Sequence, residues 1–192
     1  MPSLILASSS PYRRALLARL GLDFACHSPD IDEAPLPGET GDALALRLAR
    51  QKAAAVATQY QAGLVIGSDQ VCVNGDHLLG KPGTLERARA QLLAAAGKRV
   101  SFYTGLCVHD IASGQSRALV EPFHVHFRPL TPAQIDRYLA KEPALDCAGA
   151  FRCEGLGISL FERMDGRDPN SLVGLPLIAL VELLAEFRVD VP

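Results

Sequence analysis

The sequence lacks an excess of basic residues, and this absence argues against one class of partner. Nineteen Lys and Arg residues face twenty-one Asp and Glu residues, which leaves a formal net charge of −2. Non-specific binding to nucleic acid or to an anionic membrane depends on accumulated positive charge. Aromatic residues, which stack on bases in many nucleic-acid-binding domains, make up only 6% of the chain. We therefore expect no nucleic-acid partner.

Long apolar runs are also missing. No stretch approaches the roughly 20 apolar residues that a bilayer-spanning helix needs. The apolar stretch at residues 1–7 is too short for a signal peptide and has no basic leader. We expect a cytoplasmic protein without a membrane partner.

Paired cysteine motifs are absent as well. The five cysteines are odd in number and include no C-x-x-C pair, which argues against a disulfide framework or a zinc site. In a reducing compartment we expect buried thiols. His124 and His126 lie two apart on an expected strand, but no third ligand accompanies them, so a polar hairpin face is the favoured interpretation.

What is present is an ordinary globular composition, 48% hydrophobic and 21% charged over 192 residues. This length predicts a single domain spanning residues 1–192. Ser10 followed by Pro11 is typical of a helix start. The Asn74–Gly75 pair indicates a hairpin.

The expected strands and helices interleave along the chain. We predict strands at 4–7, 23–27, 64–67, 71–73, 78–79 and 158–163, two strands within 100–127, helices at 11–20, 42–59, 85–96, 132–141 and 177–186, and a turn at 165–170. Because hairpins interrupt the alternation, the pattern predicts an α/β fold with a mixed sheet.

Three sets of polar residues fall on loops at the ends of these elements. Hydroxyls and free N–H groups at residues 8–14 would suit an anion at a helix N-terminus, with Arg13 as a bidentate phosphate ligand. An ordinary serine cap with solvated arginines is the alternative.

The second set is acidic. Asp30, Asp32 and Glu33 follow one expected strand, and Asp69 stands where the most apolar strand ends. Carboxylates in such places are candidates for binding a hard divalent cation or for acting as a general base. Solvated loop acids remain the better interpretation for Asp30 and Asp32.

The third set is cationic. Lys52 lies in an Ala-rich helix and Lys81 in a Gly-Lys-Pro-Gly loop. With Arg13 they would match the charge of a triphosphate, although a lone lysine is usually a solvated surface residue.

These motifs, in this order, resemble the Maf family of nucleoside triphosphate pyrophosphatases. The resemblance is carried by residues 4–14, 30–33, 68–70, 80–82, 166–168 and 173–176. It implies a Maf/inosine-triphosphatase-like α/β fold, with a mixed central sheet flanked by helices and two lobes with a cleft. It also implies hydrolysis of a nucleotide to its monophosphate and pyrophosphate, a divalent metal cation (Mg or Mn) and a homodimer.

The resemblance further assigns roles by position. Asp69 would be the catalytic base, and Glu33 and Asp69 would bind the metal. The residues expected around the substrate phosphates are Ser8, Ser10, Arg13, Lys52 and Lys81.

Three further positions separate branches of the family. Tyr12, Gln70 and Glu154 resemble the branch that acts on 7-methyl-GTP, although that branch usually has tryptophan at position 12. The branch acting on dTTP and UTP typically has arginine, threonine and glutamine there. We expect a small-molecule nucleotide substrate, 7-methyl-GTP, in house-cleaning of the nucleotide pool. Another nucleotide such as dTTP or UTP, or a nucleotide-binding regulator of cell division, remains an alternative.

Overall fold

The computed structural model describes residues 2–191. Its strands are β1 (Leu4–Ala7), β2 (Phe24–His27), β3 (Leu64–Asn74), β4 (His77–Leu79), β5 (Arg99–Asp110), β6 (Ser116–Phe127) and β7 (Phe161–Gly166). Its helices are α1 (Pro11–Ala18), α2 (Gly41–Ala57), α3 (Leu85–Ala95), α4 (Pro132–Lys141), the 3₁₀ helix η1 (Leu156–Leu160), α5 (Pro169–Val173) and α6 (Leu177–Glu186).

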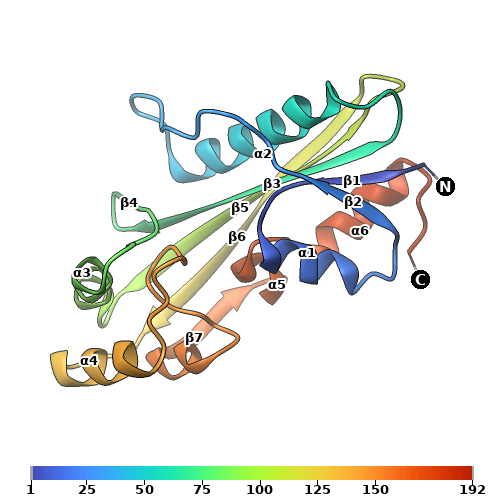
Figure 1. The fold of residues 1–192 in the computed structure, drawn as a ribbon. Coiled ribbons are helices and arrows are strands. Elements are labelled where there is room, and N and C mark those ends of the chain that lie inside the picture. Colours follow the sequence, from blue (N-terminus) through green and yellow to red (C-terminus); the bar gives the residue numbers. More distant parts are fainter. Residues whose placement is uncertain (1, 192) are drawn as a thin grey trace. The chain divides into compact units, whose positions relative to one another are not determined.

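The strands form one seven-stranded mixed sheet in the order β2-β1-β3-β5-β6-β7, with β4 paired to β3 (Figure 1). β1 runs parallel to both β2 and β3, whereas β4 is antiparallel to β3 and β7 is antiparallel to β6. Helices flank the sheet. The predicted mixed α/β fold is confirmed, as are the strand at 4–7 and the helices at 132–141 and 177–186.

Two predicted boundaries are wrong. The expected strands at 64–67 and 71–73 are a single strand, so Asp69 lies inside β3 and not at its end. β1 pairs with β3 only over Leu64–Gly67, and β3 continues beyond the last residue of β1. The polar run at 68–70 suggested a loop, but partners from other elements satisfy these side chains within the strand.

The second error lies near the C-terminus. The expected strand at 158–163 begins only at Phe161, because the Glu142 carboxylate accepts hydrogen bonds from the Leu156 and Gly157 N–H groups and the chain there forms η1. The expected turn at 165–170 contains the end of β7 and the start of α5, which the Asp168 side chain caps.

The chain divides into two compact units. The first comprises residues 1–70, 103–121 and 168–192, and the second comprises 71–102 and 122–167. β3, β5 and β6 have residues in both units. The expectation of a single domain over 1–192 stays a prediction.

In the first unit the parallel strands carry helices on both faces. Alanines and Val56 of α2 pack with Ile5, Val65 and Cys107 on one face. Side chains of α1 and α6 pack on the other face with Leu6, Ile66 and other apolar residues. Figure 1 shows α2 on one side of β1 and β3, and α1 and α6 on the other.

Helix α2 lies unusually close to the sheet because the strands beneath it carry glycine. A Cβ atom on Gly67 would clash with the carbonyl oxygen of Ala49 and lie 2.8 Å from the amide nitrogen of Ala53. A Cβ atom on Gly105 would clash with the carbonyl oxygen of Ala45. The two glycines therefore set the distance between α2 and the sheet. They also set the position of the α2 side chains that point toward Asp69 in β3.

The second unit has an aromatic core. Phe127 and Phe151 pack edge to face with each other at a centroid distance of 5.7 Å, and both contact Phe161. Helices α3 and α4 are joined by an ion pair between Arg89 and Asp136. These contacts give the second unit a core of its own.

The cysteines follow the expectation only in part. All five are free thiols, and Cys72 and Cys107 are buried, but Cys26 is exposed on β2. Burial raises the pKa of Cys107 to about 11, so this thiol stays protonated at neutral pH.

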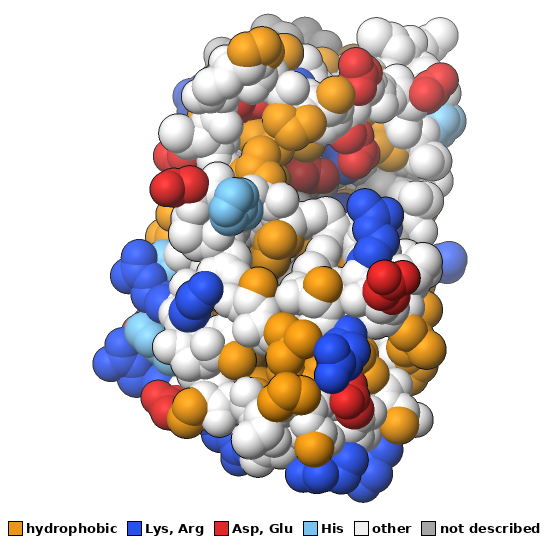
Figure 2. Space-filling model, turned by 90° about the vertical axis from the view of Figure 1, so that its left-hand side faces the viewer, with side chains coloured by type: hydrophobic (Ala, Val, Ile, Leu, Met, Phe, Trp, Pro, Cys, Tyr) orange, Lys and Arg blue, Asp and Glu red, His pale blue; other side chains and the backbone are white. Residues whose placement is uncertain are grey.

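Two surface properties bear on partners. Within residues 2–191, no helix has both the length and the apolar composition required to cross a bilayer. On the face drawn in Figure 2, most acidic side chains lie in the upper part of the view and most basic ones in the lower part, so neither sign covers the whole face.

Candidate active site

The site is built around three consecutive residues of β3. Side chains alternate between the two faces of a strand, so consecutive residues of β3 contact different elements of the fold. Asp69 points to the α2 face, where it meets Lys52. Ser68 and Gln70 point to the other face, where they meet α5 and the residue after it. One strand thus connects two groups of polar residues.

On the α2 face, two carboxylates converge on one ammonium group. Lys52 Nζ lies 2.6 Å from Asp69 Oδ1 and 2.7 Å from Glu33 Oε1. The Lys52 side chain is 7% exposed and that of Asp69 is 11% exposed, whereas Glu33 is 58% exposed. Residues 33, 52 and 69 come from a loop, a helix and a strand, and only the fold brings them together.

Arg13 joins this group from α1. The half-buried guanidinium loses hydration, which lowers its pKa, while the nearby carboxylates of Asp69 and Glu33 act in the opposite direction and favour its charged form. An arginine remains charged under such conditions. The described site therefore holds two cations, Arg13 and Lys52, and two anions, Glu33 and Asp69.

Gly174 fixes the orientation of Arg13. Arg13 Nε donates to the Gly174 carbonyl oxygen at 2.7 Å, and Ser68 Oγ donates to the same oxygen at 3.0 Å. With φ at +124°, Gly174 adopts a backbone conformation that other residues rarely adopt. The turn after α5 thus directs the guanidinium.

Gln70 is anchored on α5 by its amide group. Its Nε2 donates to the carbonyl oxygens of Ser171 at 2.8 Å and Leu172 at 2.9 Å. Thr104 on β5 donates to the Ser171 oxygen as well, at 2.8 Å. Because these acceptors need a donor, the amide nitrogen must face α5, and the Gln70 oxygen is turned away from them.

Asp168 holds the start of this segment. Its carboxylate is fully buried and accepts hydrogen bonds from the Asn170 N–H and from the Ile178 N–H at the start of α6. A buried carboxylate with two backbone N–H partners ties two helix starts together. Asp168 therefore anchors the starts of α5 and α6, the two helices between which Gly174 lies.

The predicted serines lie at the start of α1. Ser10 is the N-cap, and its Oγ accepts from the Arg13 N–H at 3.3 Å. Ser8 is buried, and its Oγ accepts from the Ser10 N–H at 3.1 Å. Tyr12 is half-buried on the same helix. The expected helix start, with Ser10 as cap and Pro11 in the first turn, is confirmed.

Comparison with known proteins identifies the family of the chain. The model of the family described as "Maf-like protein" matches residues 3–187. The chain belongs to the Maf family. The resemblance predicted from the motifs is thereby confirmed.

Three relatives match this Maf protein along nearly its whole length, and each is named "7-methyl-GTP pyrophosphatase". That of Alcanivorax borkumensis is 58% identical, with 100% of this chain and 97% of the relative aligned. That of Pseudomonas syringae pv. tomato is 57% identical, with 100% of both chains aligned. That of Nitrosococcus oceani is 57% identical, with 96% of this chain and 93% of the relative aligned.

One solved structure is more distantly similar. The Staphylococcus aureus Ham1 protein matches with a TM-score of 0.48 and 16% identity, over 66% of this chain and 72% of that one. A similarity of this degree says nothing about function.

Two predicted site residues of this Maf protein lie in the second unit. Lys81 is exposed between β4 and α3. Glu154 is exposed just before η1, and its Oε2 accepts a hydrogen bond from the Cys153 thiol at 3.3 Å. Their expected place beside Asp69 stays a prediction.

The pair Glu33 and Asp69 fits a divalent cation of the magnesium type. Mg²⁺ is usually held by one or two carboxylates, and waters and substrate phosphates complete its coordination. Among residues 2–191 no group of three or more His, Cys, Asp or Glu side chains is placed to hold a metal ion. Two carboxylates are thus the protein ligands that the described residues could offer to such a cation here.

The histidine pair binds other residues. His126 Nε2 lies 2.8 Å from Asp165 Oδ2, and His124 Nδ1 lies 2.9 Å from Ser101 Oγ. The interpretation as a polar hairpin face agrees with these contacts.

A hollow of about 750 Å³ lies elsewhere in the first unit. Its lining includes the starts of β1 and β2 together with Tyr60 and Ala62. The Glu33–Lys52–Asp69 group lies beyond the opposite, carboxyl ends of these parallel strands, where ligands of α/β sheets bind. We therefore place the candidate site at the charged Glu33–Lys52–Asp69 group and not at the hollow.

Sequence reasoning missed the groups that orient the site. Ser68, Thr104, Ser171 and Gly174 support Arg13 and Gln70, but they carry no charge and their sequence pattern assigned them no role. The available signal was that Ser68 and Gly174 lie within the motifs at 68–70 and 173–176, whereas Thr104 and Ser171 lie outside every motif.

Proposed function

We propose that this protein hydrolyses 7-methyl-GTP to 7-methyl-GMP and pyrophosphate. The observation that carries the proposal is the meeting of Glu33 and Asp69 at Lys52, with Arg13 beside them. The activity predicted from the motifs is also the one for which the three relatives are named.

In the proposed reaction Asp69 is the general base. It takes a proton from a water molecule as the water oxygen bonds to the α-phosphorus, and the bond from that phosphorus to the oxygen bridging to the β-phosphate breaks. The electron pair of this bond leaves with pyrophosphate. Arg13, Lys52 and Lys81 stabilise the negative charge that moves onto the leaving group, and Ser8 and Ser10 bind phosphate oxygens.

A divalent cation, Mg or Mn, would be held by Glu33 and Asp69 and would supply electrostatic stabilisation of the phosphate oxygens. Lys52 contacts both carboxylates, so it keeps them together before the cation arrives.

Three residues are proposed to select the base. The Glu154 carboxylate accepts hydrogen bonds only, so it suits the adjacent N1–H and N2–H₂ donors of guanine and repels the two carbonyls of a pyrimidine. Methylation at N7 makes the ring cationic, and stacking on Tyr12 would contribute roughly 0.5–2 kcal/mol. Gln70 would act beside them through its amide oxygen.

We further infer a homodimer that acts in the cytoplasm on free nucleotides, with neither nucleic acid nor membrane as a partner. The balanced charge of the chain supports the absence of nucleic-acid and membrane partners, whereas the dimer and the cytoplasm follow from the resemblance to the family and from the sequence pattern. Light scattering of the purified protein tests the dimer.

A substrate panel tests the function directly. The purified protein is incubated with Mg²⁺ and 7-methyl-GTP, GTP, dTTP, UTP or ATP, and pyrophosphate release is measured. We expect 7-methyl-GTP to give the highest kcat/KM. A preference for dTTP or UTP would refute the proposed substrate, and binding without pyrophosphate release would favour the regulator of cell division.

Two variants complete this test. Asp69→Asn should abolish turnover while the protein stays folded and still binds nucleotide. Glu154→Gln combined with Gln70→Thr should weaken 7-methyl-GTP hydrolysis and admit dTTP or UTP. An unchanged preference in the double variant would remove both residues from base selection.

A further inference from the structure

Glu33 lies on a loop that has little structure of its own. Residues 28–40 connect β2 to α2 without forming a helix or strand, and Leu36 is 55% exposed. Within the loop, one backbone hydrogen bond, from the Glu39 N–H to the Leu36 carbonyl oxygen at 3.0 Å, closes a turn. A segment of this kind needs anchors from outside to present a carboxylate at a fixed point.

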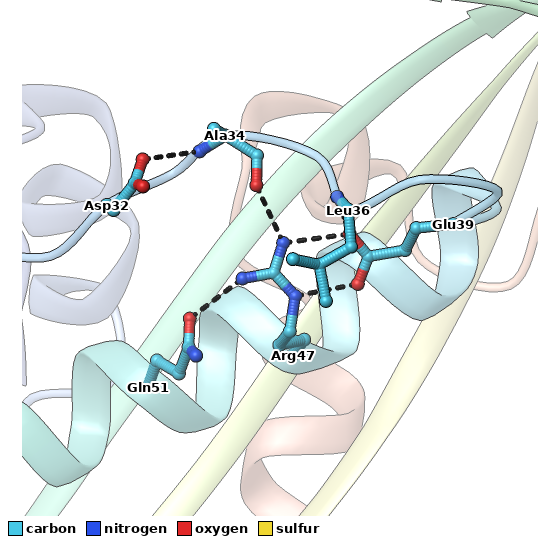
Figure 3. Close-up of polar contacts among 6 residues, drawn as sticks. All are labelled: Asp32, Ala34, Leu36, Glu39, Arg47 and Gln51. Atoms are coloured by element: carbon cyan, nitrogen blue, oxygen red, sulfur yellow. Dashed lines mark hydrogen bonds and ion pairs between the residues drawn. The ribbon is translucent and has the colours of Figure 1, made fainter.

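Arg47 on α2 provides such an anchor (Figure 3). Its Nε donates to Glu39 Oε1 at 2.7 Å and its Nη2 donates to Glu39 Oε2 at 2.8 Å, a bidentate pair. Its Nη1 donates to Gln51 Oε1 at 3.0 Å, which holds the guanidinium against the helix. The side chain is 21% exposed and that of Glu39 is 9% exposed, so the pair is largely shielded from water.

The same guanidinium also reaches the backbone next to Glu33. Arg47 Nη2 donates to the Ala34 carbonyl oxygen at 2.9 Å. On the other side, Asp32 Oδ1 accepts from the Ala34 N–H at 2.9 Å. The two peptide groups of Ala34, the residue after Glu33, are thus both restrained, and Figure 3 shows these contacts as one network.

Lys52 alone could not keep Glu33 in place during turnover. It already contacts both carboxylates, and under the proposed function it must also meet a phosphate. Arg47 lies on the same helix as Lys52, and it donates hydrogen bonds to Glu39 and Ala34 of the loop. A restraint that does not take part in the chemistry stays the same whether or not substrate is bound.

We propose that Arg47 is a positioning residue: clamped to Glu39 and to the Ala34 carbonyl, it holds the loop so that the Glu33 carboxylate stays beside Lys52 and Asp69. The proposal rests on the proposed function for the role of Glu33, but the clamp itself can be measured without substrate.

The primary experiment is hydrogen exchange of the amides at 32–39, measured by mass spectrometry on the full chain without nucleotide. Arg47→Lys keeps the positive charge but loses the planar guanidinium that makes the bidentate pair with Glu39. We expect amide exchange in this segment to become about tenfold faster. Arg89→Lys is the matched control, since Arg89 makes a bidentate pair of the same kind with Asp136 on other helices. Equal exchange at 32–39 in both variants and the unchanged protein would overturn the proposal.

The second experiment separates positioning from general stability. In Arg47→Lys the Mg²⁺ concentration for half-maximal pyrophosphate release should rise about tenfold, a typical effect for a group that supports a metal ligand, while kcat at saturating Mg²⁺ falls much less. A loss of kcat with unchanged metal dependence would overturn the positioning role. If Arg47→Lys does not fold, Glu39→Gln breaks the same pair from the other side. Should the protein release no pyrophosphate at all, the proposed function fails, and the exchange result still decides whether the clamp exists.

Discussion

The Nε of Arg13 donates a hydrogen bond to the Gly174 carbonyl oxygen at 2.7 Å, although the two residues are 161 positions apart in the sequence. Near the start of the chain a guanidinium faces Asp69 and Glu33, and near its end a glycine in a left-handed conformation determines how that guanidinium is oriented. The candidate active site thus depends on the C-terminal segment, which carries none of its charged residues.

This relationship predicts the behaviour of Arg13→Lys. The substitution keeps the positive charge but loses the planar fork and its bond to Gly174. We expect kcat/KM for the preferred nucleotide to fall about 10- to 100-fold, or roughly 1.4–2.8 kcal/mol of transition-state stabilisation. Arg14→Lys, at the exposed neighbouring position, is the control. Equal rates for the two variants would mean that Arg13 contributes charge alone.

A second prediction concerns Gln70→Glu. The carboxylate would replace the Nε2 donor and face the Ser171 and Leu172 carbonyl oxygens without a proton to share. The Ser171 oxygen keeps its bond from Thr104, but the Leu172 oxygen loses its donor and both oxygens face a negative charge. Leaving a buried acceptor unsatisfied costs about 1–3 kcal/mol, which urea unfolding at pH 7.5 would measure. The loss should shrink at acidic pH, since a protonated carboxyl regains a donor. Gln59→Glu, at an exposed position, should leave the free energy of unfolding nearly unchanged.

A third prediction tests the close contact of α2 with the sheet. Gly67→Ala places a methyl group against the Ala49 carbonyl oxygen and the Ala53 amide, so α2 must move outward. Overpacking of this kind costs about 1–3 kcal/mol, and kcat should fall as well because Lys52 moves with the helix. Gly80→Ala is the control for stability, since no atom lies within 4 Å of its added methyl. A stable and fully active Gly67→Ala would show that the helix can adjust.

The fourth prediction is a titration. Hydrogen bonding to Arg47 is the main reason that the pKa of Glu39 falls from an ordinary 4.5 to about 2. Because the folded-state pKa is the lower one, the stabilisation from this pair is present above pH 4.5 and is lost as the pH falls toward 2. NMR titration of the Glu39 side-chain carboxyl should give a value near 2, and Arg47→Met should return it toward 4.5. A Glu39 that titrates normally in the unchanged protein would contradict the clamp.

Much of the fold follows from local signals in the sequence. Ser10–Pro11 marks the start of α1, the Thr131–Gln134 capping box marks α4, and the Asn74–Gly75 turn joins β3 to β4. These signals act within a few residues, so a sequence pattern is enough to find them.

What the sequence could not supply depends on contacts between distant segments. The 3₁₀ helix before β7 forms because Glu142 caps it from 14 residues away. The pattern at 68–70 does not indicate a strand interior, because the partners of Asp69 and Gln70 come from α2 and α5. The charged residues of the site were found through their resemblance to a family. The neutral groups that orient them became visible only in three dimensions.

The continuity of β3 has a consequence for how the site responds to a ligand. Under the proposed function, a base on a loop would lose conformational freedom each time a nucleotide arrived, whereas Asp69, inside β3, lost that freedom when the sheet formed. Glu33 lies on a loop, and its position depends on side-chain contacts from α2. One carboxylate is therefore fixed by backbone pairing within the sheet and the other by hydrogen bonds from a helix, so mutations on α2 should disturb Glu33 more than Asp69.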